Sequence, residues 1–216
     1  MMNNITEIVF ILDRSGSMAG LEADTIGGFN AMLAKQKAVD GKTWVSTVLF
    51  DHVSEVLHDR IPLERVPTMT ERDYCVRGST ALLDAVGGAI RHIRNIHKYA
   101  RPEDVPTKTM FVITTDGMEN ASRQYDYDTV RNMIEEQKKH GWEFLFLGAN
   151  IDAAAEAKRF GIDASHAANY HCDTKGTALN YEVVSEAITH VRGGAPLAKN
   201  WKAKIDADYK KRGGKR

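Results

Sequence analysis

The stretch Ile8-Val9-Phe10-Ile11-Leu12-Asp13-Arg14-Ser15-Gly16-Ser17 joins an uninterrupted apolar run to a polar loop. Such a run predicts a strand that is buried on both faces, as in a parallel sheet. Asp13 follows the run, at the strand end where open α/β sheets bind their ligands. Its loop has the pattern D-x-S-x-S, which offers a carboxylate and two hydroxyls. Because Mg²⁺ and similar hard cations take oxygen ligands, the pattern indicates a metal site. The alternative is that Asp13 or Ser17 caps the next helix.

Two later stretches would complete such a site. Val76-Arg77-Gly78-Ser79-Thr80-Ala81-Leu82 is a loop that leads into a predicted helix and supplies the hydroxyl of Thr80. Phe111-Val112-Ile113-Thr114-Thr115-Asp116-Gly117 is a second apolar run that ends in a carboxylate. Neighbouring parallel strands end at the same edge of a sheet, so we expect these loops to meet. Each motif alone is weak evidence, whereas the ordered set is much more specific.

The three motifs together resemble the metal-ion-dependent adhesion site of the von Willebrand factor A domain family. Thr115-Asp116-Gly117-Met118-Glu119-Asn120 is similar to the family's T-D-G-x-x-N motif, and the resemblance covers roughly residues 6–190. It implies a site for one Mg²⁺ or Mn²⁺, with hydroxyls contacting the metal and aspartates acting through water. The residues at the matching positions are Asp13, Ser15, Ser17, Thr80 and Asp116. The resemblance also implies that a Glu or Asp of a partner protein completes the coordination of the metal. Among members of the family, this sequence resembles short, single-domain bacterial or phage proteins.

Strand and helix patterns alternate along the chain, which predicts a doubly wound α/β fold with helices on both faces of the sheet. The runs at 44–50 and 53–61 are separated by two residues, too few for a parallel crossover, so we expect an antiparallel hairpin at the edge of a mostly parallel sheet. The strands carrying Asp13 and Asp116 should be neighbours at the centre. Further strands are predicted at 109–115, 142–147 and 167–172, and helices at 21–39, 81–99, 128–140, 153–160 and 178–191.

Two features inside these segments are unusual. Gly27 and Gly28 lie within the first predicted helix, where each glycine costs about 1 kcal/mol relative to alanine. We therefore expect close packing against the sheet or a kink at that point. Residues 62–77 form a long irregular stretch directly before Thr80, and long loops of this kind are often functional.

Length and charge limit the classes of function. The chain has 216 residues, and we interpret 1–192 as one domain followed by a basic extension at 193–216. Lys plus Arg and Asp plus Glu both number 29, which gives no overall attraction to nucleic acid or to an anionic membrane. Within the extension, residues 199–216 contain eight Lys or Arg and two Asp, a local charge of +6. Trp201, Ile205 and Tyr209 repeat every four residues there. The segment with these three residues could therefore form a short helix that docks one apolar side. The seven residues from Lys210 to Arg216 would then be a flexible basic end, which we interpret as a solvated tail because it is only a weak nucleic-acid signal.

The N-terminal residues contain no basic segment and the first apolar run is short, which favours a cytoplasmic protein without a signal peptide or membrane span. Cys75 and Cys172 form no C-x-x-C pair, so we interpret them as reduced thiols and not as a disulfide or zinc site.

Three functions are compatible with the motifs. The first is a non-enzymatic adaptor in which the cation bridges to an acidic residue of a partner protein. The second is a metal-dependent hydrolase with Asp116 or His52 as the base. The third is a structural subunit with a silent metal site. We expect no enzymatic activity, because no phosphate loop, nucleophile elbow or His/Asp cluster is evident. Residues expected to flank the cation are Arg14, Met18, Asp51, Arg77, Glu119 and Asn120.

Overall fold

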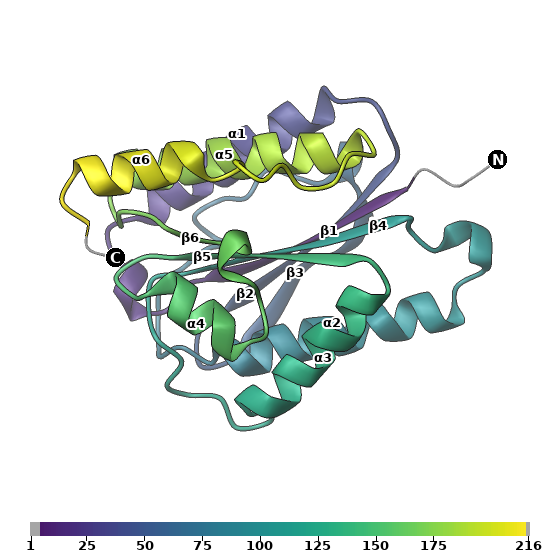
Figure 1. Cartoon of the computed structure of the whole chain (residues 1–216), viewed down its shortest axis with the longest axis horizontal. Helices are drawn as coiled ribbons and strands as arrows, with labels where there is room; N and C mark the ends of the chain where they lie inside the picture. The colour runs from purple at the N-terminus through teal and green to yellow at the C-terminus, as the bar shows by residue number, and fades with distance from the viewer. Residues whose placement is uncertain (1–4, 215–216) are drawn as a thin grey trace.

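The computed structural model describes residues 5–214, which form a six-stranded sheet between two layers of helices (Figure 1). The strands are β1 (Thr6–Asp13), β2 (Thr43–Phe50), β3 (Ser54–Pro62), β4 (Lys108–Thr115), β5 (Trp142–Gly148) and β6 (Ala167–Asn169). Their order is β3-β2-β1-β4-β5-β6; β3 pairs antiparallel to β2 and every other pair is parallel. This arrangement confirms the predicted doubly wound α/β fold and its antiparallel edge hairpin.

β1 lies at the point where the strand order reverses. The chain passes outward from β1 through β2 to β3 on one side, and from β4 through β5 to β6 on the other. Asp13 pairs in register with Phe50 of β2, and Leu12 pairs with Thr114 of β4. The loops after β1 and β4 therefore leave the sheet side by side, where α/β sheets have their ligand crevice. This result confirms the predicted central position of β1 next to β4.

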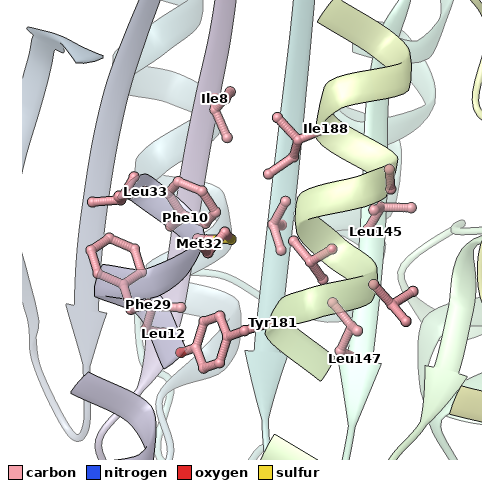
Figure 2. Packing of buried hydrophobic residues seen from close by; sticks show 14 of the residues in the cluster. Ile8, Phe10, Leu12, Phe29, Met32, Leu33, Leu145, Leu147, Tyr181 and Ile188 are labelled. Carbon is pink, nitrogen blue, oxygen red and sulfur yellow. The ribbon is translucent and has the colours of Figure 1, made fainter. Parts of the chain in front are cut away.

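Side chains of β1 alternate between two apolar cores, as expected for a strand buried on both faces. Ile8, Phe10 and Leu12 belong to one core, which also contains side chains from α1 (Glu22–Lys37), α5 (Thr174–Arg192) and α6 (Ala203–Lys211). Figure 2 shows Phe29 and Met32 of α1 and Tyr181 and Ile188 of α5 within this core. Val9 and Ile11 face the other core, with α2 (Leu82–Tyr99), α3 (Tyr127–Lys139) and α4 (Ala153–Arg159).

The observed boundaries of most elements lie within a few residues of the predicted ones, with two clear departures near the end of the domain. β6 ends at Asn169, before the predicted Cys172, and α5 begins at Thr174. Asp173 explains the earlier start of α5, because its side chain accepts a hydrogen bond from the Gly176 amide at 2.7 Å and caps the helix. This cap leaves Cys172 in the short connection between β6 and α5.

Gly28 permits close packing, but against a helix and not against the sheet. A Cβ atom at this position would lie 2.3 Å from Cδ2 of Tyr181, a buried side chain of α5. Gly27, in contrast, has no atom within 4 Å of the position of such a Cβ. The expected contact with the sheet was therefore wrong, because at this position α1 packs against α5.

The C-terminal segment packs on the domain. Trp201 and Ile205 belong to the apolar core under α5, and the Trp201 indole donates a hydrogen bond to the Ser165 carbonyl at 2.8 Å. Tyr209 stacks on His171 with ring centroids 4.7 Å apart. The predicted docked helix is thus confirmed. The flexible, solvated basic end was predicted to begin at Lys210, but Lys210 and Lys211 lie in α6; residues 215–216 are outside the described part of the chain.

Across residues 5–214, every helix is too short or too polar to cross a membrane.

Candidate metal centre

Five side chains from three chain segments converge at the carboxyl ends of β1 and β4. Asp13 ends β1, and Ser15 and Ser17 lie in the turn that follows, which includes one short 3₁₀ helix (Gly16–Met18). Thr80 directly precedes the residue that caps α2, and Asp116 follows β4. The structure thus brings together the five residues selected from the sequence, and it positions them on loops supported by a rigid sheet.

Hydrogen bonds link four of these five side chains. Oδ1 of Asp13 accepts the Ser15 amide at 2.7 Å, and the Ser15 and Ser17 hydroxyl oxygens are 3.0 Å apart. The Ser17 hydroxyl in turn donates to Oδ1 of Asp116. These hydrogen bonds join the loop after β1 to the loop after β4.

Thr80 joins the group through the third loop. A Cβ atom on Gly117 would lie 3.2 Å from the Thr80 hydroxyl and 3.4 Å from the Ser17 hydroxyl, so both hydroxyls are close to this glycine. Asn120 holds the Thr80 backbone by two hydrogen bonds. The side-chain Oδ1 of Asn120 accepts the Thr80 backbone N–H at 2.9 Å, and the backbone N–H of Asn120 donates to the Thr80 carbonyl at 3.0 Å. Asn120 therefore ties the second loop to the loop that carries Asp116.

The site contains two buried carboxylates and no cationic side chain paired with either. Asp13 is 1% exposed and Asp116 is 2% exposed, and within residues 5–214 neither forms an ion pair with Lys, Arg or His. Burial raises the pKa of Asp13 above its ordinary value and the charge of Asp116 raises it further, although hydrogen bonds from Thr115 and Ser15 act in the opposite direction. Uncompensated buried carboxylates next to three hydroxyls form a donor set that fits a hard divalent cation.

Arg14 follows Asp13 in sequence but does not compensate its charge. Its Nε lies 2.9 Å from Oδ2 of Asp51, a fully buried residue at the end of β2. Arg77 Nε lies at the same distance from that oxygen, and His52 Nδ1 is 2.8 Å from Oδ1. Burial alone would raise the pKa of Asp51, but the hydrogen bonds from Arg77, the Val53 amide and Arg14 outweigh it and lower the pKa. The positive charges nearest to the site are therefore neutralised by a separate carboxylate.

The alternative role of Asp13 or Ser17 as a helix cap is not observed. Leu21 occupies the N-cap position of α1, and no side chain caps that helix. Among the predicted flanking residues, Met18 is buried in the loop, and Glu119 accepts the Leu83 amide at 2.8 Å in the first turn of α2. Glu119 and Asn120 thus shape the loops through hydrogen bonds to backbone atoms.

Three residues that the sequence prediction left out support the site directly. The Thr115 hydroxyl donates to Oδ2 of Asp13 at 2.6 Å, and the Tyr74 hydroxyl donates to the Asp13 carbonyl at 2.5 Å. The Cys172 thiol donates to Oδ2 of Asp116 at 3.2 Å. Burial and this contact raise the pKa of Cys172 to about 12, which keeps the group a thiol. Thr115 lies within the T-D-G motif and was identifiable there, whereas nothing in the sequence distinguishes Tyr74 or Cys172.

The geometry offers little to the hydrolase interpretation. His52, one candidate base, makes its hydrogen bond to Asp51. Both oxygens of the other candidate, Asp116, accept hydrogen bonds from Ser17 and Cys172. In the described part of the chain no group of three or more His, Cys, Asp or Glu side chains is arranged to hold a metal, so the site depends on hydroxyls.

No protein-family model and no curated protein sequence matches the chain. Solved structures do match at the level of fold. The vWF domain of the type V pili tip protein Mfa5 from Porphyromonas gingivalis has a TM-score of 0.60 at 12% identity, covering 85% of this chain and 94% of that one. A mutant of the PilB minor pilin from Streptococcus sanguinis gives the same TM-score and identity, with 94% of this chain and 63% of that chain covered.

A third similar structure has a metal in its motif. Proximal thread matrix protein 1 from the mussel byssus, described with a zinc-occupied MIDAS motif, has a TM-score of 0.57 at 12% identity over 88% of this chain. The present chain spans about half the length of that protein, 47%. Identities this low establish similarity of fold alone. The comparisons and the sheet topology therefore show that the chain has the fold of von Willebrand factor A domains.

Proposed function

We propose that the chain is a divalent-metal-dependent protein-binding module. Mg²⁺ or Mn²⁺ would be held by Asp13, Ser15, Ser17, Thr80 and Asp116. The observation that carries this proposal is the pair of buried carboxylates without a cationic partner, next to three hydroxyls. The similarity to a fold whose mussel representative holds zinc in its MIDAS motif adds support.

The ligand set suits binding better than hydrolysis. A bound cation would supply an electrophilic position that a Glu or Asp of a partner protein can fill, because most protein ligands here are neutral hydroxyls. Asp13 and Asp116 would balance the charge of the cation, and Thr115 and Cys172 would orient the two carboxylates through their second oxygens. No side chain in this arrangement is free to act as a fixed base, so we propose a non-enzymatic function.

Cys75 and Cys172 are free thiols in the structure. Because secreted proteins tend to pair their cysteines, this observation favours the cytoplasm as the location of the protein. Fractionation of cells that produce the chain at native levels tests the assignment, and recovery of the chain outside the cytoplasm would contradict it.

The metal site is tested by titrating the purified chain with Mn²⁺ in a calorimeter. We expect one site in the parent chain, no measurable site in Asp13→Ala, and weaker binding in Thr80→Ala that Thr80→Ser restores. Asp128→Ala is the matched control, because Asp128 is an exposed residue of α3. Equal Mn²⁺ binding by the parent and by Asp13→Ala would refute the assignment of the site.

A further inference from the structure

A polar groove of about 570 Å³ opens beside the candidate metal centre. One wall is formed by His52 and Val53 after β2 and by Ser79, the neighbour of Thr80. The opposite wall is the loop of residues 120–124, which begins with the asparagine that holds Thr80. The groove and the metal centre thus share two loops. A partner segment bound at the metal would therefore have the groove beside it.

The acidic residues around this groove are already engaged. Oxygens of Asp84 accept the backbone amides of residues 123, 124 and 125 at 2.8–2.9 Å. Those of Glu119 accept the amides of residues 83, 121 and 122 and the Ser122 hydroxyl. Asp51 is fully buried beneath its basic partners. These carboxylates hold the walls in place and are poorly available to a ligand.

One basic side chain at the groove is available. Arg123 is exposed, and within residues 5–214 its guanidinium has no hydrogen-bond or ion-pair partner; only its backbone amide is fixed, by Asp84. The His52 side chain is 55% exposed, and its Nδ1 is 2.8 Å from Oδ1 of Asp51. A neutral imidazole that donates from Nδ1 has an acceptor at Nε2, so His52 shapes the wall and Arg123 supplies the donors for an acidic ligand. The ring lies against Gly78, where a Cβ atom would be 2.4 Å from Nδ1. Gly78 has φ +69°, so this close approach requires glycine at the position.

We propose that the groove binds a second acidic side chain of the partner segment, with Arg123 as the residue that recognises it. This inference rests on the proposed function, since the first acidic residue of the same segment would reach the metal centre. The partner would therefore present two acidic residues in an extended segment, in which side chains two residues apart point to the same side. The second contact supplies specificity, because complementary charge at the edge of an interface discriminates between partners.

Two synthetic peptides test the inference, one with a single Glu between glycines and one with a second Glu two residues later. Their affinities are measured by ¹⁵N-¹H NMR titration of the chain in Mg²⁺ and in EDTA. In Mg²⁺ we expect the second Glu to raise the affinity of the parent about fivefold, the upper end for an exposed ion pair. The gain should fall at high salt. In Arg123→Gln the gain should disappear while the affinity for the single-Glu peptide stays unchanged. Arg94→Gln, an exposed arginine of α2, is the control.

The outcomes separate the inference from the function on which it rests. If the single-Glu peptide binds in Mg²⁺ and the second Glu adds nothing, or its gain survives in Arg123→Gln, the groove proposal is wrong and the metal proposal stands. If the two-Glu peptide binds equally in EDTA and still requires Arg123, the groove binds acidic segments but the metal bridge is wrong. If neither peptide shifts any resonance, both proposals are overturned.

Discussion

The Ser17 hydroxyl donates a hydrogen bond to Oδ1 of Asp116, a residue 99 positions later in the chain. This contact joins the loop after β1 to the loop after β4 across the point where the strand order reverses. Oδ2 of the same carboxylate accepts the thiol of Cys172, from the loop after β6. Asp116 therefore connects three loops. Its carboxylate is also close enough to the buried carboxylate of Asp13 for the two negative charges to repel each other when no cation is bound.

The first prediction concerns the repulsion between those carboxylates. In EDTA, Asp116→Asn should unfold at a higher temperature than the parent, with a gain of about 1 kcal/mol, because it removes one of two buried charges of the same sign. In Mg²⁺ the order should reverse: the parent gains about 2.7 kcal/mol at a concentration 100-fold above its dissociation constant, and the variant gains nothing. Thermal unfolding in both buffers measures the two effects. Parent and variant curves that do not respond to Mg²⁺ would contradict the metal site.

A second prediction concerns Asp51, which is fully buried and binds Arg14, Arg77 and His52. Asp51→Asn removes the buried charged partner of Arg14 and leaves its guanidinium with the half-exposed carboxylate of Glu55, 2.8 Å from Nη1. Breaking a buried ion pair in this way costs about 3 kcal/mol. Urea unfolding should show this loss in the free energy of unfolding. The control is Asp59→Asn. Among residues 5–214 the exposed carboxylate of Asp59 pairs only with His92, so its loss should cost less than 1 kcal/mol. Equal losses in the two variants would mean that the Asp51 cluster does not support the loops.

Much of the fold was predictable because its signals are local. An apolar run that ends in a carboxylate identified β1 and β4. The connection after Phe50 was predicted to have two residues and has three, and either length requires an antiparallel hairpin. The hydroxyl spacing in D-x-S-x-S likewise selected side chains that the structure brings together. These features depend on residues close in sequence, so periodicity and motif spacing describe them well.

The remaining features depend on contacts between distant segments. Nothing near Arg14 indicates that its side chain pairs with Asp51, 37 residues away, and leaves Asp13 without a counter-charge. Tyr74 reaches the Asp13 carbonyl from the long irregular stretch, whose path follows from packing. The sequence showed only that the Trp201 segment could dock, for the same reason: the side chains around Trp201 come from segments that are far apart in sequence.

The third prediction uses the two adjacent glycines of α1 as a matched pair. Gly28→Ala should destabilise the chain by about 2 kcal/mol, because the new methyl group would overlap the buried ring of Tyr181. Gly27→Ala should stabilise it by about 1 kcal/mol, because its methyl group meets no atom and alanine favours the helix. Chemical denaturation measures both. If both substitutions stabilise the chain to the same extent, α5 does not pack on α1 as described.

The last prediction concerns pH. His58 is 3% exposed on β3, with Nδ1 3.0 Å from the Thr47 hydroxyl. Burial lowers the pKa of His58 from its ordinary value of 6.5, and the opposing charge of Asp73 does not restore it. Above pH 6.5 the imidazole is neutral in both states, so its contribution to stability is fully present. As the pH falls through that value the unfolded chain takes up a proton before the folded chain does, which favours unfolding until the lower folded pKa is passed.

His58→Gln keeps a polar group beside Thr47 and removes this titration. Between pH 7.5 and 5.5 the parent should therefore lose up to about 1 kcal/mol more stability than the variant. Urea unfolding at several pH values measures the difference, and the comparison cancels the titration of the other histidines. A variant that loses stability in parallel with the parent over this range would show that His58 is protonated as readily in the folded chain as in the unfolded one.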